Sequence, residues 1–324
     1  MEENTEQRVD LTLFSEKIQE LKDRIASVIV GQEQTVDLVL TAILANGHVL
    51  IEGVPGVAKT LLARLTARLI DADFSRIQFT PDLMPSDVLG TTVFNMKTNS
   101  FDFHQGPIFA DIVLVDEINR APAKTQAALF EVMEERQISI DGTTHRMGEL
   151  FTIMATQNPV EQEGTYKLPE AQLDRFLMKI TMDYPSLEEE VNILERHQTN
   201  AALVKLDNIT PSITKEELLS LRAFMNRVFV DRTLLQYIAL IVQQTRTSKA
   251  VYLGASPRAS VAMLQSSKAY ALLQGRDFVT PEDIKFVAPY VLQHRLILTA
   301  EAEMEGYSPV KVTQRLIDKV EVPK

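Results

Sequence analysis

The sequence predicts an α/β fold with a mostly parallel sheet, followed by a smaller region made of helices. Over the first 185 residues, short apolar runs alternate with helical patterns, as is typical of parallel strands joined by helices. One of the runs, residues 112–115, is apolar at every position, which indicates a strand buried on both faces. After Tyr184-Pro185 only helical patterns follow. We therefore predict a sheet domain at 1–185, a connecting segment at 186–212 and a helical domain at 213–324.

The apolar runs and turn residues place the individual elements. Strands are expected at 48–52, 75–79, 111–116, 150–156 and 177–183. Between the second and third strands, VFNMKTNSFDF alternates like a hairpin closed by Asn99-Ser100, and Asp141-Gly142 predicts the turn of a second hairpin. Helices are expected near 186–197, 213–229, 231–247, 257–274 and 281–292. Capping boxes start the first two of them, with Ser186 and Glu189, and with Thr214 and Glu217. Thr280-Pro281 starts the last.

The composition excludes several classes of site and partner. The sequence has no cysteine, so disulfides, thiolate metal sites and cysteine nucleophiles are excluded. A formal charge of −11 and the lack of a basic cluster argue against nucleic acid as a partner. The first ten residues are acidic and polar, the reverse of a signal peptide. Residues 36–54, the longest apolar stretch, are too interrupted by polar residues to span a bilayer. We expect a cytoplasmic protein without membrane insertion.

The stretch GVPGVAKT, residues 53–60, follows an expected strand and precedes a helical pattern. It differs from the usual phosphate loop only in Ala58, which replaces a glycine. We expect Ala58 at the start of the helix, with helical dihedral angles that alanine adopts easily. Lys59 would reach the β- and γ-phosphates, and the Thr60 hydroxyl would bind magnesium. The alternative is a plain strand-to-helix turn with an incidental Lys-Thr. The predicted phosphate-binding residues are Gly53, Val54, Pro55, Gly56, Val57, Ala58, Lys59, Thr60 and Leu61.

An acidic pair, Asp116-Glu117, ends the expected strand at 111–116. Carboxylates at the carboxyl end of a parallel strand lie where open α/β sheets bind ligands. Asp116 would hold Mg²⁺ together with Thr60, and Glu117 would polarise the attacking water. The alternative is that the pair only caps the helix that follows.

Three further polar residues follow other expected strands or begin helices. Asn158, at the end of the fourth strand, could orient water and contact the γ-phosphate, or could simply precede Pro159 in a turn. Arg175, just before the fifth strand, could stabilise charge at the γ-phosphate of a neighbouring subunit, or pair locally with Asp174 or Glu170. Arg258 begins a helix, where the helix dipole opposes a cation, so an anion such as phosphate is expected to offset it.

GVPGVAKT, IVLVDEINRAP, ATQNP, LPEAQLDRF and GASPRA, in this order, closely resemble the AAA+ ATPases of the MoxR group. The resemblance covers about residues 15–300, and alanine at position 58 is usual in that family. It implies an AAA+ core with a five-stranded parallel sheet and a C-terminal all-α lid, assembled as a ring, usually a hexamer. It implies that Asn158 is the sensor-1 residue, Arg175 the arginine finger and Arg258 the sensor-2 residue. Val30 and Gly31 correspond to the segment that lines the adenine pocket.

The resemblance also implies cofactors, partners and activity. ATP and Mg are the expected cofactors, and GTP is disfavoured because the sequence has no N-K-x-D motif. Members act as chaperone-like motors on protein clients and are often paired with a von Willebrand factor A domain protein. The alternatives are a metal-chelatase-like motor subunit, a DNA motor and an adaptor that binds ATP without hydrolysis. The DNA alternative is weakened by acidic residues in and near the hairpins, Asp82, Asp87, Asp102, Asp141 and Glu149 against Lys97 and Arg146.

Overall fold

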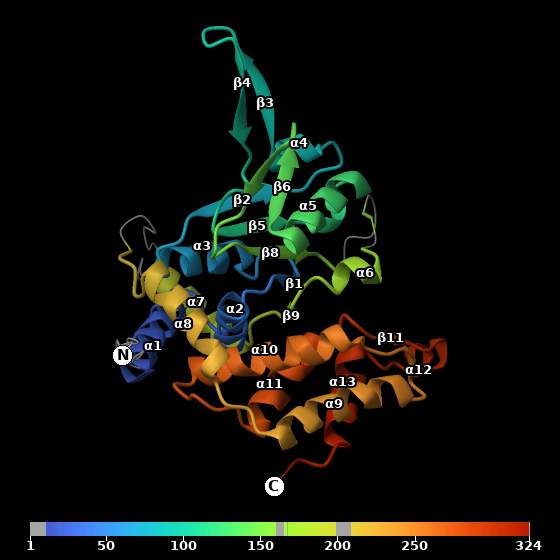
Figure 1. Ribbon diagram of the computed structural model, residues 1–324. Coiled ribbons are helices and arrows are strands. Elements are labelled where there is room, and N and C mark those ends of the chain that lie inside the picture. The colour runs from blue at the N-terminus through green and yellow to red at the C-terminus, as the bar shows by residue number, and fades with distance from the viewer. Residues whose placement is uncertain (1–10, 160–164, 167, 199–208, 324) are drawn as a thin grey trace, which may run out of the picture.

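The computed structural model describes residues 11–159, 165–166, 168–198 and 209–323. Figure 1 shows a sheet flanked by helices, a layer of helices below it, and one hairpin that projects from the opposite end. The first ten residues and part of the predicted connecting segment lie outside the described residues. Within the described part, no helix combines the length and apolar character needed to cross a membrane.

A five-stranded parallel sheet forms the centre of the first region, as predicted, in the order β2-β5-β8-β1-β9. The strands are β1 (Val49–Gly53), β2 (Phe74–Gln78), β5 (Ile112–Asp116), β8 (Thr152–Gln157) and β9 (Met178–Met182). Each overlaps the run of residues that predicted it. All five residues of β5 are buried, which agrees with its uninterrupted apolar sequence.

Both faces of the sheet are covered, and alternate residues of β5 belong to two different hydrophobic cores. Leu114 packs in a core that includes the helices α1 (Leu11–Val28), α2 (Glu33–Leu44) and α3 (Lys59–Leu69). Val113 and Val115 pack on the other face, against α5 (Ala123–Glu135). The first core continues into the C-terminal helices, so the two regions share one apolar interior.

Two antiparallel hairpins extend from this region. The first pairs β3 (Gly90–Asn95) with β4 (Ser100–Gln105) after the short helix α4 (Pro85–Leu89). Its loop is residues 96–99 and Ser100 already pairs with Asn95, so of the predicted closing dipeptide Asn99-Ser100 only Asn99 lies in the loop. The second hairpin pairs β6 (Gln137–Ile140) with β7 (Thr143–Arg146). Asp141 and Gly142 form its turn with positive φ angles of 50° and 78°, as predicted.

The C-terminal region is mainly helical and begins its helices at the predicted caps. Thr214 accepts a hydrogen bond from the Glu217 backbone N–H, and Thr280 precedes Pro281 at the start of its helix. The helices are α7 (Leu187–Gln198), α8 (Lys215–Phe224), α9 (Arg232–Thr247), α10 (Pro257–Leu273), α11 (Pro281–Leu292), α12 (Ala300–Met304) and α13 (Pro309–Asp318). A short antiparallel ribbon of β10 (Val251–Leu253) and β11 (Ile297–Leu298) was not predicted.

Helix α8 packs on the sheet region, although the predicted boundary assigns it to the lid. The Lys215 Nζ lies 2.6 Å from Asp111 Oδ1, and Arg222 donates to the Asn46 side chain at 2.8 Å. Helix α10 packs against α2, and α11 packs against β9. The division at 213 therefore stays a prediction about domains, since contacts across it are extensive.

Candidate nucleotide-binding site

The topology brings the predicted phosphate and metal residues to one edge of the sheet. Strands β5, β8 and β1 are neighbours and parallel, so their carboxyl ends lie side by side. Asp116 is the last residue of β5, Asn158 follows β8, and Gly53 ends β1. Open parallel sheets bind ligands at this edge. We call it the carboxyl edge.

The phosphate loop connects β1 to α3 in a conformation that requires its glycines. A Cβ on Gly53 would lie 2.8 Å from the Met182 carbonyl oxygen on β9, so no side chain fits there. Gly56 has open space around it, but its φ of +89° favours glycine. The Lys59 ammonium group donates a hydrogen bond to the Gly53 carbonyl, folding back over the loop. The lysine is thus held across the loop that would hold phosphate.

Ala58 departs from the prediction of ordinary helical dihedral angles. Its φ of 63° and ψ of 22° lie in the left-handed region, which costs an L-residue about 1–2 kcal/mol. A glycine would adopt this conformation without that cost, which explains why phosphate loops usually carry one. The Ala58 methyl packs against the first hydrophobic core, and this contact offsets part of the strain.

The acidic pair is held by side chains that sequence reasoning missed. Asp116 is buried and accepts hydrogen bonds from Arg76 Nε at 2.6 Å and from the Thr156 hydroxyl at 3.1 Å. Glu117 accepts from Gln78 Nε2 at 2.9 Å. The available signal was the alternation in SRIQF, because Arg76 and Gln78 are polar residues on either side of buried Ile77.

The capping alternative for the acidic pair is wrong. Helix α5 begins after Pro122, which makes no side-chain cap. Glu117 instead adopts left-handed dihedral angles, with φ of 56° and ψ of 51°, and its carboxylate lies 3.1 Å from Arg120 Nη1. A strained backbone at a polar sheet edge is common at functional sites.

Thr60 and Asp116 offer the oxygen ligands that Mg²⁺ prefers. The described residues contain no group of three or more His, Asp or Glu side chains with the geometry of a metal site. Mg²⁺ that binds together with a nucleotide usually takes one or two protein oxygens and completes its shell with water and phosphates, and one hydroxyl with one carboxylate would fit that arrangement.

Asn158, Val30 and Gly31 lie in closely packed surroundings. Asn158 is 7% exposed, so its amide is enclosed at the end of β8 rather than displayed on a surface turn. Gly31 has a φ of +73°, and a Cβ there would meet the Glu189 carboxylate of α7 at 2.3 Å. Val30 and Gly31 thus form a tight junction between α1 and α2, beside α7.

Arg175 and Arg258 lie together at the opposite edge. The strand register pairs Val49 with Met178 and Gly53 with Met182, so the residues just before β9 lie beside the beginning of β1. At about 3.3 Å per residue, the beginning of β1 lies about 13 Å from its end at Gly53, and Arg175 precedes the residue of β9 that pairs with this beginning. We call this the amino edge.

One carboxylate joins the two arginines. Arg175 Nε lies 3.8 Å from Glu134 Oε2, and Arg258 Nη2 lies 3.4 Å from Glu134 Oε1. Arg258 Nη1 is also 3.9 Å from Asp174 Oδ2. The local partner of Arg175 is therefore Glu134 rather than the expected Asp174 or Glu170. Carboxylates supply the anion that was expected beside Arg258 at the start of α10.

Known proteins resemble this chain along nearly its whole length. Residues 48–178 match the ATPase family associated with various cellular activities (AAA), and residues 243–318 match the AAA lid domain. The chain is 48% identical to the uncharacterized protein YeaC of Bacillus subtilis, covering 93% of each. It is 45% identical to the chaperone MoxR1 of Mycobacterium tuberculosis, covering 93% of this chain and 81% of that protein.

A more distant relative and a solved structure agree. The protein MoxR of Methylorubrum extorquens is 31% identical over 91% of each chain. A crystal structure of a proposed ATPase from Cytophaga hutchinsonii is 41% identical, covers 97% of each chain and superposes with a TM-score of 0.88. Together with the sheet order, the phosphate loop and the lid, these similarities show that the chain belongs to the MoxR family of AAA+ ATPases.

Proposed function

We propose that this protein hydrolyses ATP with Mg²⁺ in an oligomeric ring, usually a hexamer, and uses the energy to remodel or mature protein complexes. The observation that carries the proposal is the separation of the two sheet edges. The phosphate loop and the acidic pair lie at the carboxyl edge, whereas Arg175 and Arg258 lie at the amino edge of the same chain. This separation supports a site that two subunits complete together.

The residues at the carboxyl edge supply binding and water activation. Lys59 exchanges its bond to the Gly53 carbonyl for phosphate oxygens, and the loop N–H groups add further donors. Asp116 and Thr60 would hold Mg²⁺, which would supply positive charge beside the phosphates. Glu117 leaves Gln78 and Arg120 to accept a proton from the attacking water, while Asn158 orients that water.

The residues at the amino edge act on the neighbouring subunit. Arg175 would leave Glu134 to stabilise the charge that develops on the neighbour's γ-phosphoryl group. Arg258 contacts the same carboxylate, so we place it in the neighbour's site as well rather than in its own. Under this proposal the sensor-2 residue acts on the neighbouring subunit.

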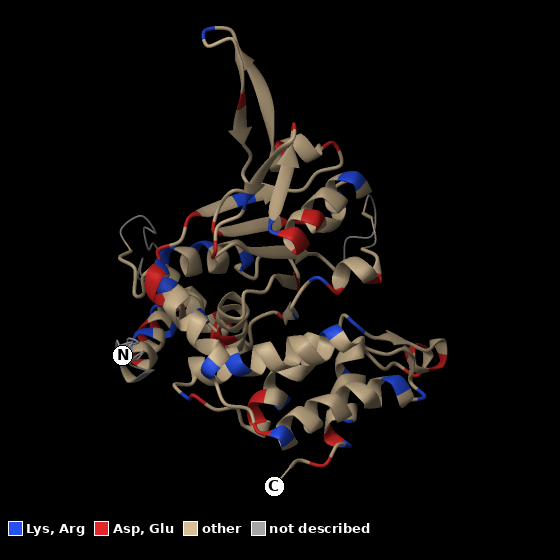
Figure 2. Ribbon diagram, viewed as in Figure 1, with Lys and Arg blue, Asp and Glu red and all other residues tan. Residues whose placement is uncertain are grey.

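The client and partner are proposed from the relatives and from the surface charge. The name chaperone given to the Mycobacterium relative supports a protein client, and we propose a von Willebrand factor A domain protein as the partner. Figure 2 shows basic colour on the projecting hairpin only at its tip, with acidic residues along and below it. Such a surface does not favour a nucleic-acid backbone as the substrate. A cytoplasmic location fits these partners.

Steady-state ATP hydrolysis measured over a range of protein concentrations tests the proposal. Specific activity should rise with concentration, because active sites form only when subunits associate. The decisive arm mixes Lys59→Ala with Arg175→Ala subunits. The first still donates its arginine and the second still binds ATP, so mixed rings regain part of the activity. Activity that is independent of concentration, or mixtures that stay inactive, would reject the shared site.

A further inference from the structure

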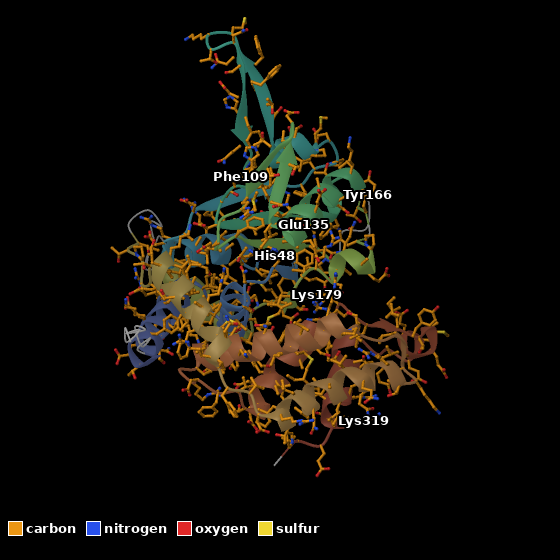
Figure 3. All side chains as sticks on the ribbon, in the orientation of Figure 1. His48, Phe109, Glu135, Tyr166, Lys179 and Lys319 are labelled. Atoms are coloured by element: carbon orange, nitrogen blue, oxygen red, sulfur yellow. The ribbon has the colours of Figure 1, made fainter. Side chains whose placement is uncertain are left out.

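Three consecutive lid residues contact the backbone of the segment that carries Arg175. Gln293, His294 and Arg295 directly follow α11. Gln293 Nε2 donates to the Lys179 carbonyl, and His294 Nε2 lies 3.0 Å from the Phe176 carbonyl. We call residues 293–295 the lid latch. Figure 3 places Lys179 directly above the layer of lid helices.

Arg295 makes the densest set of these contacts. Its Nε donates to Asp174 Oδ1 at 2.6 Å, and its Nη2 donates to the Phe176 carbonyl at 2.7 Å and the Asp174 carbonyl at 3.3 Å. Its Nη1 donates to the Leu177 carbonyl at 3.2 Å. The side chain is only 4% exposed. One guanidinium therefore holds the backbone on both sides of Arg175.

The latch also connects to Arg258. Asp174 accepts from Arg295 with one carboxylate oxygen and lies 3.9 Å from Arg258 Nη1 with the other. Glu134 then joins Arg258 to Arg175. Three arginines and two carboxylates thus form one chain of charges, and Arg295 is its buried end.

Stability of the lid alone does not account for this arrangement. Apolar contacts of α10 with α2 already attach the lid to the sheet region. A simple attachment could use any carbonyl of the sheet region, whereas Arg295 uses Asp174, Phe176 and Leu177, which flank the predicted finger. Loss of a buried arginine that donates to three of these carbonyls would shift this backbone rather than merely weaken a surface contact.

We propose that Arg295 is a positioning residue for Arg175, with Gln293 and His294 as supporting contacts, so that the lid of one subunit sets the active site of the next. The inference rests on the proposed function, because it assumes that Arg175 acts on a neighbour. When the lid moves as its own subunit binds or releases nucleotide, the contacts of Arg295 transmit that movement to the backbone beside Arg175. In this way the nucleotide bound by each subunit would control ATP hydrolysis in the active site of the next subunit.

Arg295→Lys is the test variant, because lysine keeps the charge and the apolar stem but cannot hold several carbonyls in a plane. Arg276→Lys is the matched control, since Arg276 makes a comparable ion pair with buried Asp283 within the lid. We expect Arg295→Lys to lower kcat by about 10²-fold with KM for ATP unchanged, the effect of a small misplacement of a catalytic group. Arg276→Lys should leave kcat near that of the wild type.

Mixing experiments give a readout that a purely structural role would not move. Arg295→Lys subunits should regain activity when mixed with Lys59→Ala subunits, which donate a well-positioned finger. They should gain nothing from Arg175→Ala subunits, because both variants are defective as donors. Unchanged activity of Arg295→Lys, or rescue by Arg175→Ala instead, would overturn the inference.

Two further arms keep the result unambiguous. If thermal unfolding shows that Arg295→Lys is not folded, Gln293→Leu takes its place in the same mixtures. It should regain activity with Lys59→Ala and not with Arg175→Ala, and the reverse result would overturn the inference. The reference mixture of Lys59→Ala with Arg175→Ala tests the shared site itself. If that pair fails, the proposed function fails. If that pair regains activity but Arg295→Lys is rescued by Arg175→Ala, as Lys59→Ala is, only the positioning role is rejected.

Discussion

The two edges of the sheet differ in how their polar residues are held. At the carboxyl edge, Asp116 and Glu117 accept hydrogen bonds from side chains of β2, namely Arg76 and Gln78. At the amino edge, Arg175 and Arg258 share the Glu134 carboxylate, whereas Arg295 is held mainly by backbone carbonyls. An arginine with one carboxylate partner can exchange that partner for a ligand, whereas an arginine enclosed by several carbonyls fixes the backbone around it. The carboxyl edge is therefore suited to binding, and the amino edge presents exchangeable arginines on a fixed backbone.

Glu117→Gln is the strongest test of the carboxyl edge. Turnover should fall by about 10³-fold or more, because the amide cannot accept a proton from water. ATP binding should persist, since the phosphate contacts of Lys59 and the loop are intact. Steady-state hydrolysis and fluorescent-nucleotide titration measure the two effects separately. Wild-type turnover in this variant would remove Glu117 from the role of general base.

Arg175→Ala is the equivalent test of the amino edge. We expect turnover to fall by about 10³-fold, the scale of an arginine finger, with nucleotide affinity of the single subunit preserved. Arg227→Ala, which removes an exposed arginine of the lid region, is the control. The contrast between the edges disappears if Arg175→Ala weakens nucleotide binding as much as it slows turnover.

Lys59→Ala separates binding from catalysis within the carboxyl edge. Affinity for ATP should fall by roughly 10²-fold, because a charge-assisted hydrogen bond to phosphate contributes about 3 kcal/mol. Lys97→Ala, at the exposed tip of the first hairpin, should leave affinity unchanged. Fluorescent-nucleotide titration measures both. Equal affinities for wild type and Lys59→Ala would contradict the phosphate-loop assignment.

The buried histidine of the amino edge predicts a dependence of stability on pH. Burial, with a further contribution from Arg136, lowers the pKa of His48 to about 3. Its Nδ1 accepts from the Ile153 N–H at 2.9 Å and its Nε2 lies 3.2 Å from the Met133 carbonyl, so the neutral ring is built into the fold. Figure 3 places His48 in the interior of the sheet region, below Glu135.

The lowered pKa of His48 determines whether the stability of the fold rises or falls with pH. Because the unfolded state binds a proton near pH 6.5 and the folded state does not, stability is complete above pH 6.5 and declines as the pH falls toward 3. At pH 5 the loss from His48 is about 2 kcal/mol. Urea unfolding at pH 7 and pH 5 measures it, and His48→Asn should flatten the difference. If His48→Asn loses as much unfolding free energy between pH 7 and pH 5 as the wild type does, His48 does not titrate as described.

The sequence predicted the parts of this molecule that depend on local patterns. The strands follow from short apolar runs, and the residues at the carboxyl edge follow from where those runs end. Arg175 and Arg258 were found by motif, but their meeting at Glu134 was not, because Glu134 lies on an ordinary helical face of α5 and is brought to them by the tertiary fold. The β10–β11 ribbon was missed for a similar reason, since its strands are two and three residues long and far apart in sequence.

Ala58 gives the smallest expected effect and the sharpest test of local strain. Its left-handed conformation costs about 1–2 kcal/mol, whereas a glycine there would increase the entropy of the unfolded chain by about 0.4–1 kcal/mol. Ala58→Gly should therefore stabilise the protein slightly, by less than about 1 kcal/mol once the lost methyl packing is included. Ala127→Gly, on the exposed side of right-handed α5, should instead destabilise it by about 1 kcal/mol. Urea denaturation of both variants measures the difference in sign. If Ala58→Gly is destabilised as much as Ala127→Gly, the loop stores no strain, and the packing of the methyl alone explains why alanine stands in this phosphate loop.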